Sequence, residues 1–275
     1  MNYSNPETLA SLIAPVSQLI KSAGDVLIDK INSVSGVREK NKHDYVSDVD
    51  QYIEGYLQQK LEKLYPEIEF MGEELNKGNQ DIQGLHWVVD PLDGTTNYLH
   101  KFPVYSISLA LEMNEQVLLG MVYNPVNQNL YYGIKDQGAY LNDQPLQVSS
   151  RKRFTGGLYA TGFPFRHHLN IDKYLASFKN VLLCSDGIRR CGSAALDLCM
   201  VAEGVLDGYW EDGLSRWDIA AGMLIIREAG GVVKDFKGKD FPHITGNVIT
   251  SNAEIFSDFY QNAIIPYINY QTAED

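Results

Sequence analysis

The stretch that most constrains how this chain can fold is Trp87-Val88-Val89-Asp90-Pro91-Leu92-Asp93-Gly94-Thr95-Thr96-Asn97. Its three leading apolar residues predict the end of a buried strand, and the proline and glycine that follow predict a turn. At such a turn Asp90 and Asp93 can point into a common space, together with a free carbonyl at Leu92. Oxygen donors of this kind are the ligands that Mg²⁺ prefers. The stretch therefore predicts a metal site at a strand end, with an ordinary Asp/Gly turn as the alternative.

The residues that follow the two carboxylates are suited to an anion. Gly94 lets the backbone approach a ligand closely, and the amides and hydroxyls of Thr95 and Thr96 can donate hydrogen bonds to phosphate oxygens. A cation and a phosphate group are thus expected at the same turn.

Apolar periodicity organises the first part of the chain, residues 1–150. Apolar side chains at helical spacing predict helices over Pro6–Lys30 and from Asp48 to Pro66. A short strand is predicted at Ile68–Met71. Between Val104 and Val148, short strands separated by turn residues predict an antiparallel meander.

Strands and helices alternate in the second part, residues 151–275. The mixture predicts an α+β layered sandwich whose two halves share one core, since no linker-like segment separates them. The expected strands are 158–161, 181–184, 206–210, 232–235 and 248–250, and the expected helices are centred on 174–178, 194–203, 217–229 and 254–268.

Composition excludes several classes of protein. A chain of 275 residues with 44% hydrophobic residues can bury a sizeable core, and no apolar run reaches the length of a membrane span. The polar N-terminus and the three cysteines, which show no Cys-x-x-Cys spacing, favour a cytoplasmic protein with reduced thiols. A net charge of −12 argues against nucleic acid as a partner, although bound Mg²⁺ can reverse the local sign of an acidic pocket.

Other acidic positions can join the central turn. Gly72-Glu73-Glu74 follows a short apolar strand, and Asp50 and Asp218 lie near predicted helix starts. Helix capping is the alternative role for Asp48 and for Asp218. The segment Gly192–Ala195 also opens a predicted helix, and its free amides can hold an anion or a hydroxyl.

Three stretches together resemble the magnesium-dependent, lithium-sensitive phosphatase superfamily, and within it the inositol monophosphatase family. They are Gly72-Glu73-Glu74, the segment Asp90–Asn97, and Trp217–Gly222 with Glu228–Gly231. Their order and separation fit that family, and the similarity extends over nearly the whole chain. The resemblance implies a layered αβαβα sandwich of the inositol monophosphatase / fructose-1,6-bisphosphatase type.

The resemblance also implies two or three Mg²⁺ ions. Carried over to the matching positions, Glu73, Asp90 and the Leu92 carbonyl would hold one ion. Asp90, Asp93 and Asp218 would hold a second, with Asp90 bridging the two. Li⁺ is expected to inhibit by occupying the weaker metal position.

The implied catalytic residues are Asp50, Glu73, Glu74 and Thr95. Asp50 would orient Thr95, whose hydroxyl would orient the attacking water, and Glu74 would lie beside that water. Direct attack by a metal-activated water is the expected mechanism, because the chain has no Gly-x-Ser-x-Gly, no Gly-rich phosphate loop with Lys, and no His-Glu-x-x-His.

The implied substrate pocket adds residues from the second half. Gly94 and Thr95 would receive the phosphate, and Glu211 would accept hydrogen bonds from sugar-ring hydroxyls. The expected substrate contacts are Leu92, Asp93, Gly94, Thr95, Gly192, Ser193, Ala194, Glu211 and Asp218.

Inositol 1-phosphate is the expected substrate, released as inositol and phosphate. The alternative is a broad-specificity phosphatase that acts on the 2′-phosphate of NADP(H), on fructose 1,6-bisphosphate or on 3′-phosphoadenosine 5′-phosphate. Arg189 and Arg190 would accept a second phosphate in such substrates, or else they are only solvated surface residues. An alternative of another class is a non-catalytic regulatory or binding protein of the same fold. A homodimer is expected in every case, with no membrane partner.

Overall fold

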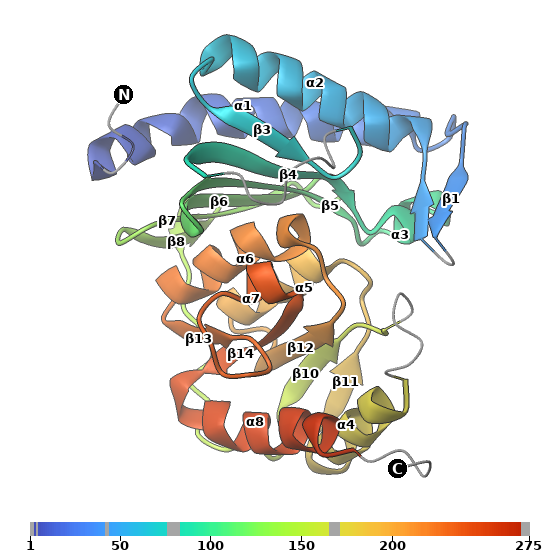
Figure 1. Cartoon of the computed structure of the whole chain (residues 1–275), viewed down its shortest axis with the longest axis vertical. Coiled ribbons are helices and arrows are strands. Elements are labelled where there is room, and N and C mark those ends of the chain that lie inside the picture. The colour runs from blue at the N-terminus through green and yellow to red at the C-terminus, as the bar shows by residue number, and fades with distance from the viewer. Residues whose placement is uncertain (1–2, 4, 42–43, 76–82, 165–170, 271–275) are drawn as a thin grey trace.

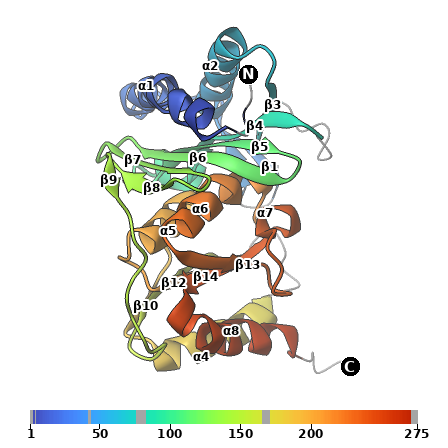
Figure 2. The same ribbon diagram turned by 90° about the vertical axis from the view of Figure 1, so that its left-hand side faces the viewer.

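The computed structural model describes residues 3, 5–41, 44–75, 83–164 and 171–270, with the side chains of residues 40, 41, 44 and 45 excepted. Two sheets and their helices form five layers, seen edge-on in Figures 1 and 2. From the top of Figure 1 these are a helix pair, a seven-stranded sheet, a central helix layer, a five-stranded sheet and a second helix pair. The expected layered αβαβα sandwich is confirmed.

The seven-stranded sheet contains the predicted antiparallel meander. Its first two strands are parallel, and each later strand pairs antiparallel with the one before it. In sheet order, its strands are β3 (Glu69–Gly72), β4 (Leu85–Asp93), β5 (Ser106–Met113), β6 (Gln116–Asn124), β7 (Asn129–Ile134), β8 (Gly138–Leu141) and β9 (Gln144–Pro145).

The five-stranded sheet contains both parallel and antiparallel strand pairs, because its strands come from separate strand–helix units. β10 is parallel to both of its neighbours, while β14 is antiparallel to both of its own. In sheet order, its strands are β11 (Gly187–Arg189), β10 (Leu158–Thr161), β12 (Gly208–Asp212), β14 (Asn247–Asn252) and β13 (Gly231–Lys234). A separate hairpin pairs β1 (Arg38–Asn41) with β2 (Asp44–Val46).

Helices cover both faces of each sheet. Their bounds are α1 (Pro6–Lys30), α2 (Asp48–Leu64), α3 (Thr95–Leu99), α4 (Ile171–Cys184), α5 (Ala194–Ala202), α6 (Arg216–Glu228), α7 (Pro242–Thr245) and α8 (Ala253–Ile268). α1 and α2 form the top layer, α5 and α6 lie between the sheets, and α4 and α8 form the bottom layer.

Alternating side chains on β4 show how the layers are built. Trp87 and Val89 pack in the apolar cluster beneath α1 and α2, while Val88 packs in the cluster that contains α5 and α6. This is the alternation expected of a strand covered on both faces, and it is why the sequence there is continuously apolar. A third cluster, which includes Tyr159 and Phe259, fills the space between the five-stranded sheet and its outer helices.

The central helix α6 lies against the seven-stranded sheet because a glycine faces it. A methyl group built on Gly120 of β6 would lie 2.6 Å from the carbonyl oxygen of Ala221. A side chain at this position would push α6 away from the sheet. The position of α6 matters for function because its first turn carries Asp218.

Among the described residues, helix α1 is the one helix that is long and apolar enough to cross a membrane. No apolar run of that length was expected from the sequence. One face of α1 is buried, and Leu12, Val16, Ile20 and Leu27 belong to the cluster shared with α2 and the sheet. This packing accounts for its apolar character as that of a core helix.

Several local predictions were wrong in instructive ways. β4 continues through Pro91 to Asp93, with an irregular register between Asp90 and Asp93 instead of a turn after Val89. The expected strand at 181–184 is the last turn of α4, because a short apolar run fits a buried helix as well as a strand. Asp48 is not a helix cap: Ser47 caps α2, and Asp48 instead accepts hydrogen bonds from Ser35.

A buried polar cluster joins the seven-stranded sheet to α6 and α7. Arg216 Nη2 donates a 2.5 Å hydrogen bond to Glu112 Oε1. Nε2 of His86 lies 3.9 Å from Glu112 Oε1, and Nε2 of His243 lies 3.8 Å from Glu112 Oε2. Burial, reinforced by the Arg216 charge, lowers the pKa of His86 to about 4 and that of His243 to about 3. Both imidazoles are therefore neutral in the folded protein near pH 7.

These buried histidines predict a loss of stability in mild acid. Because their pKa values are lowered on folding, the unfolded chain binds more protons below its own histidine pKa of about 6.5, so the free energy of unfolding falls as pH drops from there toward 4. We expect each histidine to account for about 1–2 kcal/mol of that loss between pH 7 and pH 5. Urea unfolding of the wild type, His86→Gln and His243→Gln at the two pH values measures it.

Comparison of variants isolates this effect from other titrating groups. Burial raises the pKa of Glu112, so protonation of that carboxyl works in the opposite direction. If each variant lost as much stability between pH 7 and pH 5 as the wild type, the assignment of the acid sensitivity to these two side chains would be wrong.

Candidate active site

A cavity of about 530 Å³ lies at the junction of the two halves. β4 and α3 supply one wall of it, and the starts of α5 and α6 with the end of β12 supply the other. Of the residues predicted from the sequence, those that line it are Glu73, Asp90, Leu92, Asp93, Gly94, Thr95, Thr96, Arg190, Gly192, Ser193, Ala194, Glu211 and Asp218.

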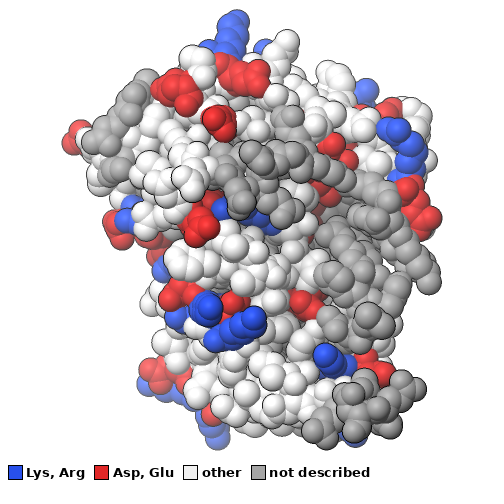
Figure 3. Space-filling view, viewed as in Figure 1, with Lys and Arg blue, Asp and Glu red and all other residues white. Residues whose placement is uncertain are grey.

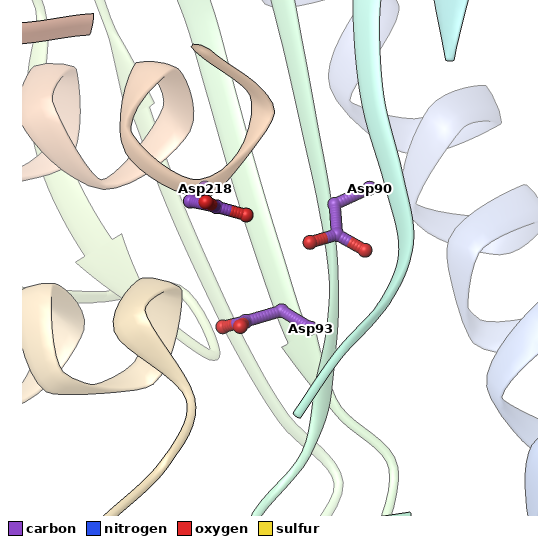
Figure 4. Close-up of side chains that lie close together, drawn as sticks. All are labelled: Asp90, Asp93 and Asp218. Carbon is purple, nitrogen blue, oxygen red and sulfur yellow. The ribbon is translucent and has the colours of Figure 1, made fainter. Parts of the chain in front are cut away.

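Three of these carboxylates form a compact cluster. One oxygen from each of Asp90, Asp93 and Asp218 lies within 4.8 Å of the others, and all three residues are buried. Figure 4 shows Asp90 and Asp93 on β4 facing Asp218 on α6, with the carboxyl groups turned toward a common space. Residues separated by more than 120 positions in the sequence thus meet at one point.

Burial and mutual repulsion raise the pKa values of two members of this cluster, Asp90 and Asp93. For Asp93, burial and then the charge of Asp218 raise the pKa to about 7. For Asp90, burial and then the charges of Glu73, Asp93 and Asp218 raise the pKa well above its usual range. A cation between these three buried carboxyl groups would stabilise their charged forms.

Asp93 is held by the N-terminus of α5. Its Oδ2 accepts a 2.6 Å hydrogen bond from the Ser193 hydroxyl and a 2.8 Å hydrogen bond from the Ala195 amide. The free amides predicted at this helix start therefore bind the protein's own carboxylate. Ser193 also caps α5 through the amide of Leu196. These bonds fasten β4 of the first half to α5 of the second.

Asp218 occupies the third position of α6 and not the cap itself. Ser215 is the N-cap residue, and its amide donates a 2.7 Å hydrogen bond to Asp218 Oδ2. The predicted capping function and the predicted place in the cluster are thus combined in one side chain.

A second capping box holds Thr95. Asp50 Oδ2 accepts hydrogen bonds from the amide and the hydroxyl of Ser47 at 2.9 and 2.5 Å, which leaves Oδ1 facing Thr95. The Thr95 hydroxyl lies 3.0 Å from Asp50 Oδ1 and 3.1 Å from the Leu92 carbonyl oxygen. Burial raises the pKa of Asp50, whereas these hydrogen bonds favour its charged form. The hydroxyl of Thr95 is therefore fixed by a buried acceptor that does not itself line the cavity.

Sequence reasoning missed Glu54, a charged residue on the apolar face of α2. It is fully buried and accepts hydrogen bonds from the amides of Glu74 and Leu75 at 2.7 and 2.6 Å. It thereby holds the segment that carries Glu73 at the cavity. Glu74 is not among the lining residues. A charge on an otherwise apolar helical stripe was the signal that could have revealed Glu54.

The outer part of the cavity is also acidic. Glu211 on β12 is buried and accepts a hydrogen bond from the Tyr209 hydroxyl. Gly162 makes room for it, because a methyl group at that glycine would overlap the Glu211 carboxyl group. Asp197 on α5, another lining residue that the sequence did not indicate, is 2% exposed, and burial raises its pKa well above its usual range.

The donor set fits a hard divalent cation. Every candidate ligand atom in the cluster is an oxygen, and the Leu92 carbonyl lies on the same strand as two of the carboxylates. Oxygen-only ligation is typical of Mg²⁺, and the raised pKa values of Asp90 and Asp93 show that charge compensation is needed. The residues that can hold such ions are Glu73, Asp90, Leu92, Asp93 and Asp218.

Comparisons with known proteins agree on one family. The model of the inositol monophosphatase family matches residues 8–269. The Nus factor SuhB of Pseudomonas aeruginosa is 40% identical over 242 residues, which cover 86% of this chain and 89% of that protein. The inositol-1-monophosphatase of Rhizobium meliloti is 39% identical over 249 residues, covering 90% and 93%. The crystal structure of the extragenic suppressor protein suhB from Bartonella henselae superposes with a TM-score of 0.86 at 37% identity, covering 92% and 98%.

The cluster predicts that Asp93→Asn separates metal binding from folding. The amide oxygen of Asn can still accept from Ser193 and Ala195, so we expect a folded protein whose melting temperature in EDTA is at least that of the wild type. Mg²⁺ affinity should fall by more than about 100-fold, because even groups that merely support a metal ligand contribute 10–100-fold. A Mg²⁺ titration followed by thermal melting measures both quantities.

Asp25→Asn is the matched control, since Asp25 is exposed on α1. It should leave the Mg²⁺-dependent rise in melting temperature unchanged. An Asp93→Asn protein that Mg²⁺ stabilised as much as it does the wild type would contradict a metal site at this cluster.

Proposed function

Because this chain belongs to the inositol monophosphatase family, we propose that it is a Mg²⁺-dependent phosphate monoester hydrolase with inositol 1-phosphate as its substrate. The products are inositol and inorganic phosphate, formed by direct attack of water on phosphorus. The proposal rests on the cluster of Asp90, Asp93 and Asp218 at the floor of the cavity.

Metal binding is assigned to five residues on the grounds of donor chemistry and position. Glu73, Asp90 and the Leu92 carbonyl would hold one ion, and Asp90, Asp93 and Asp218 would hold a second. When bound, Mg²⁺ lowers the pKa of water and neutralises the charge that develops on the leaving oxygen. Asp90, Leu92 and Asp93 lie on β4, Asp218 lies in the first turn of α6, and Glu73 follows β3.

The chain's own donors orient the reactants. The Thr95 hydroxyl, held by Asp50, is placed to orient the attacking water and to move its proton toward a buried acceptor. Gly94 and the first amides of α3 face the cavity and can donate to the phosphate oxygens. Glu73 lies at the cavity wall, and Glu74 follows it on the segment held by Glu54.

A polyol leaving group suits the outer cavity. Glu211 presents a carboxylate whose position is fixed by Tyr209, and a carboxylate accepts strong hydrogen bonds from hydroxyl groups. Gly192, Ser193 and Ala194 line the same region. The alternative is a broad-specificity phosphatase that also accepts NADP(H), fructose 1,6-bisphosphate or 3′-phosphoadenosine 5′-phosphate, for which a cavity of about 530 Å³ has room.

A second candidate function comes from the names of the relatives. The Pseudomonas aeruginosa protein, 40% identical, is named a Nus factor. A regulatory function of that kind for this chain would not require the carboxylate cluster, and the cluster is complete here. Acidic and basic side chains are interspersed on the face shown in Figure 3, which displays no broad basic surface. Hydrolysis is therefore the function the site supports best.

The direct test is phosphate release in Mg²⁺, with and without Li⁺, from four substrates. These are inositol 1-phosphate, NADP, fructose 1,6-bisphosphate and 3′-phosphoadenosine 5′-phosphate. We expect inositol 1-phosphate to give the highest kcat/KM and Li⁺ to inhibit. Comparable rates on all four would establish the broad-specificity alternative, and no release from any of them would favour the non-catalytic function.

The Thr95 hydroxyl predicts a loss that falls on kcat. Thr95→Ala should lower kcat by about 10²–10⁴-fold, the range for a positioned proton-transfer group, with Mg²⁺ affinity unchanged. Thr95→Ser keeps the hydroxyl and should recover most of that loss. Steady-state kinetics with Mg²⁺ titrations decides, and an alanine variant as active as the serine variant would refute this function of Thr95.

A further inference from the structure

We propose that Arg190, held against Phe163, forms a subsite for a second anionic group of the substrate, so that on a given carbon skeleton the enzyme prefers the bisphosphorylated to the monophosphorylated form. The inference rests on the proposed function, because it concerns the substrate class of the same cavity. The subsite lies on the wall formed by the start of α5 and the loop after β10.

Charge sets Arg190 apart in this cavity. Among the described residues, seven Asp and Glu residues line the cavity, and Arg190 is the one Lys or Arg that does so. Its neighbour Arg189 does not line it. Because bound Mg²⁺ and backbone amides would bind the phosphate that is cleaved, the Arg190 guanidinium is available to a second anionic group.

The guanidinium group is positioned by its surroundings. Its central carbon lies 5.1 Å from the centre of the Phe163 ring, which is stacking distance for a cation on an aromatic face. Phe163 packs edge-on against the buried ring of Tyr174, with ring centres 5.8 Å apart. Nη1 of Arg190 lies close above Gly192, since a methyl group built there would be only 2.6 Å away.

The donors of this guanidinium are available to a ligand. No hydrogen bond or ion pair joins Arg190 to another residue in the part of the chain described here, although it lies in a cavity rich in carboxylates. A planar guanidinium that is already oriented binds phosphate through paired N–H donors and loses little freedom in doing so. Phe163 is 48% exposed, so this platform faces the cavity mouth.

Arg190 and the carboxylate cluster are carried by different elements. Arg190 lies between β11 and the start of α5, whereas Asp90 and Asp93 lie on β4 and Asp218 lies on α6. We therefore assign Arg190 to a second anionic group of the substrate and not to the phosphate over the carboxylates.

The experiment compares two pairs of substrates that differ by one phosphate. They are inositol 1,4-bisphosphate with inositol 1-phosphate, and fructose 1,6-bisphosphate with fructose 1-phosphate. The quantity measured is the ratio of kcat/KM within each pair, or the ratio of inhibition constants against inositol 1-phosphate where a compound is not hydrolysed. We expect Arg190→Gln to lower the ratio about tenfold in at least one pair and to change the monophosphate values less than twofold.

Two further variants make the result specific. Arg189→Gln is the matched control, because Arg189 is exposed and bonds only to its own strand through the Ile188 carbonyl; it should leave both ratios unchanged. Phe163→Leu keeps an apolar wall but removes the platform, and should lower the bisphosphate ratio about threefold. In the wild type, raising the ionic strength should reduce the bisphosphate preference, and this sensitivity should be weaker in Arg190→Gln.

Failure of the subsite and failure of the proposed function give different results. If Arg190→Gln left both ratios unchanged, or lowered monophosphate and bisphosphate hydrolysis equally, the subsite would be refuted while hydrolysis stood. If the wild type hydrolysed none of the four compounds, the proposed function would fall. Calorimetric titration of the same four compounds into wild type and Arg190→Gln would then test the subsite through the ratio of dissociation constants within each pair.

Discussion

The burial of three carboxylates at one point is the constraint on which the rest of this structure depends. Asp90, Asp93 and Asp218 repel one another in a poorly solvated place, and the raised pKa values of Asp90 and Asp93 reflect that cost. The fold opposes it with oriented donors: Ser193 and the α5 amides on Asp93, and the Ser215 amide on Asp218. The bonds to Asp93 also join β4 to α5, so they contribute both to the junction of the two halves and to the arrangement of the site.

The acidic cavity explains how a chain with a net charge of −12 can act on phosphate esters. The carboxylates bind cations, and the cations with the amides of α3 bind the anion. Glu211, fixed by Tyr209, offers an acceptor to hydroxyl groups, while Arg190 on Phe163 offers the only cationic side chain among the described lining residues. Reaction chemistry and substrate selection thus belong to different residues of one cavity.

The relatives show why function is argued from this site and not from the fold. Proteins named inositol-1-monophosphatase and Nus factor SuhB are about equally similar to this chain, at 39% and 40% identity. One fold can carry both kinds of protein. The complete carboxylate cluster, with the Asp50–Thr95 hydrogen bond behind it, is the feature that favours hydrolysis here.

The sequence by itself determined the layered fold, the meander and the acidic motifs, because periodicity and short motifs are local properties that each segment carries alone. It also indicated Asp50 and Thr95 as partners through resemblance. Only the tertiary structure decided that β4 passes through Pro91, that the α5 amides serve Asp93, and that Glu54 supports the Glu73 segment. It also distinguished Arg190 from Arg189, adjacent residues with the same side chain. These outcomes depend on which residues distant in sequence come within hydrogen-bonding distance, and that is settled when the two sheets pack.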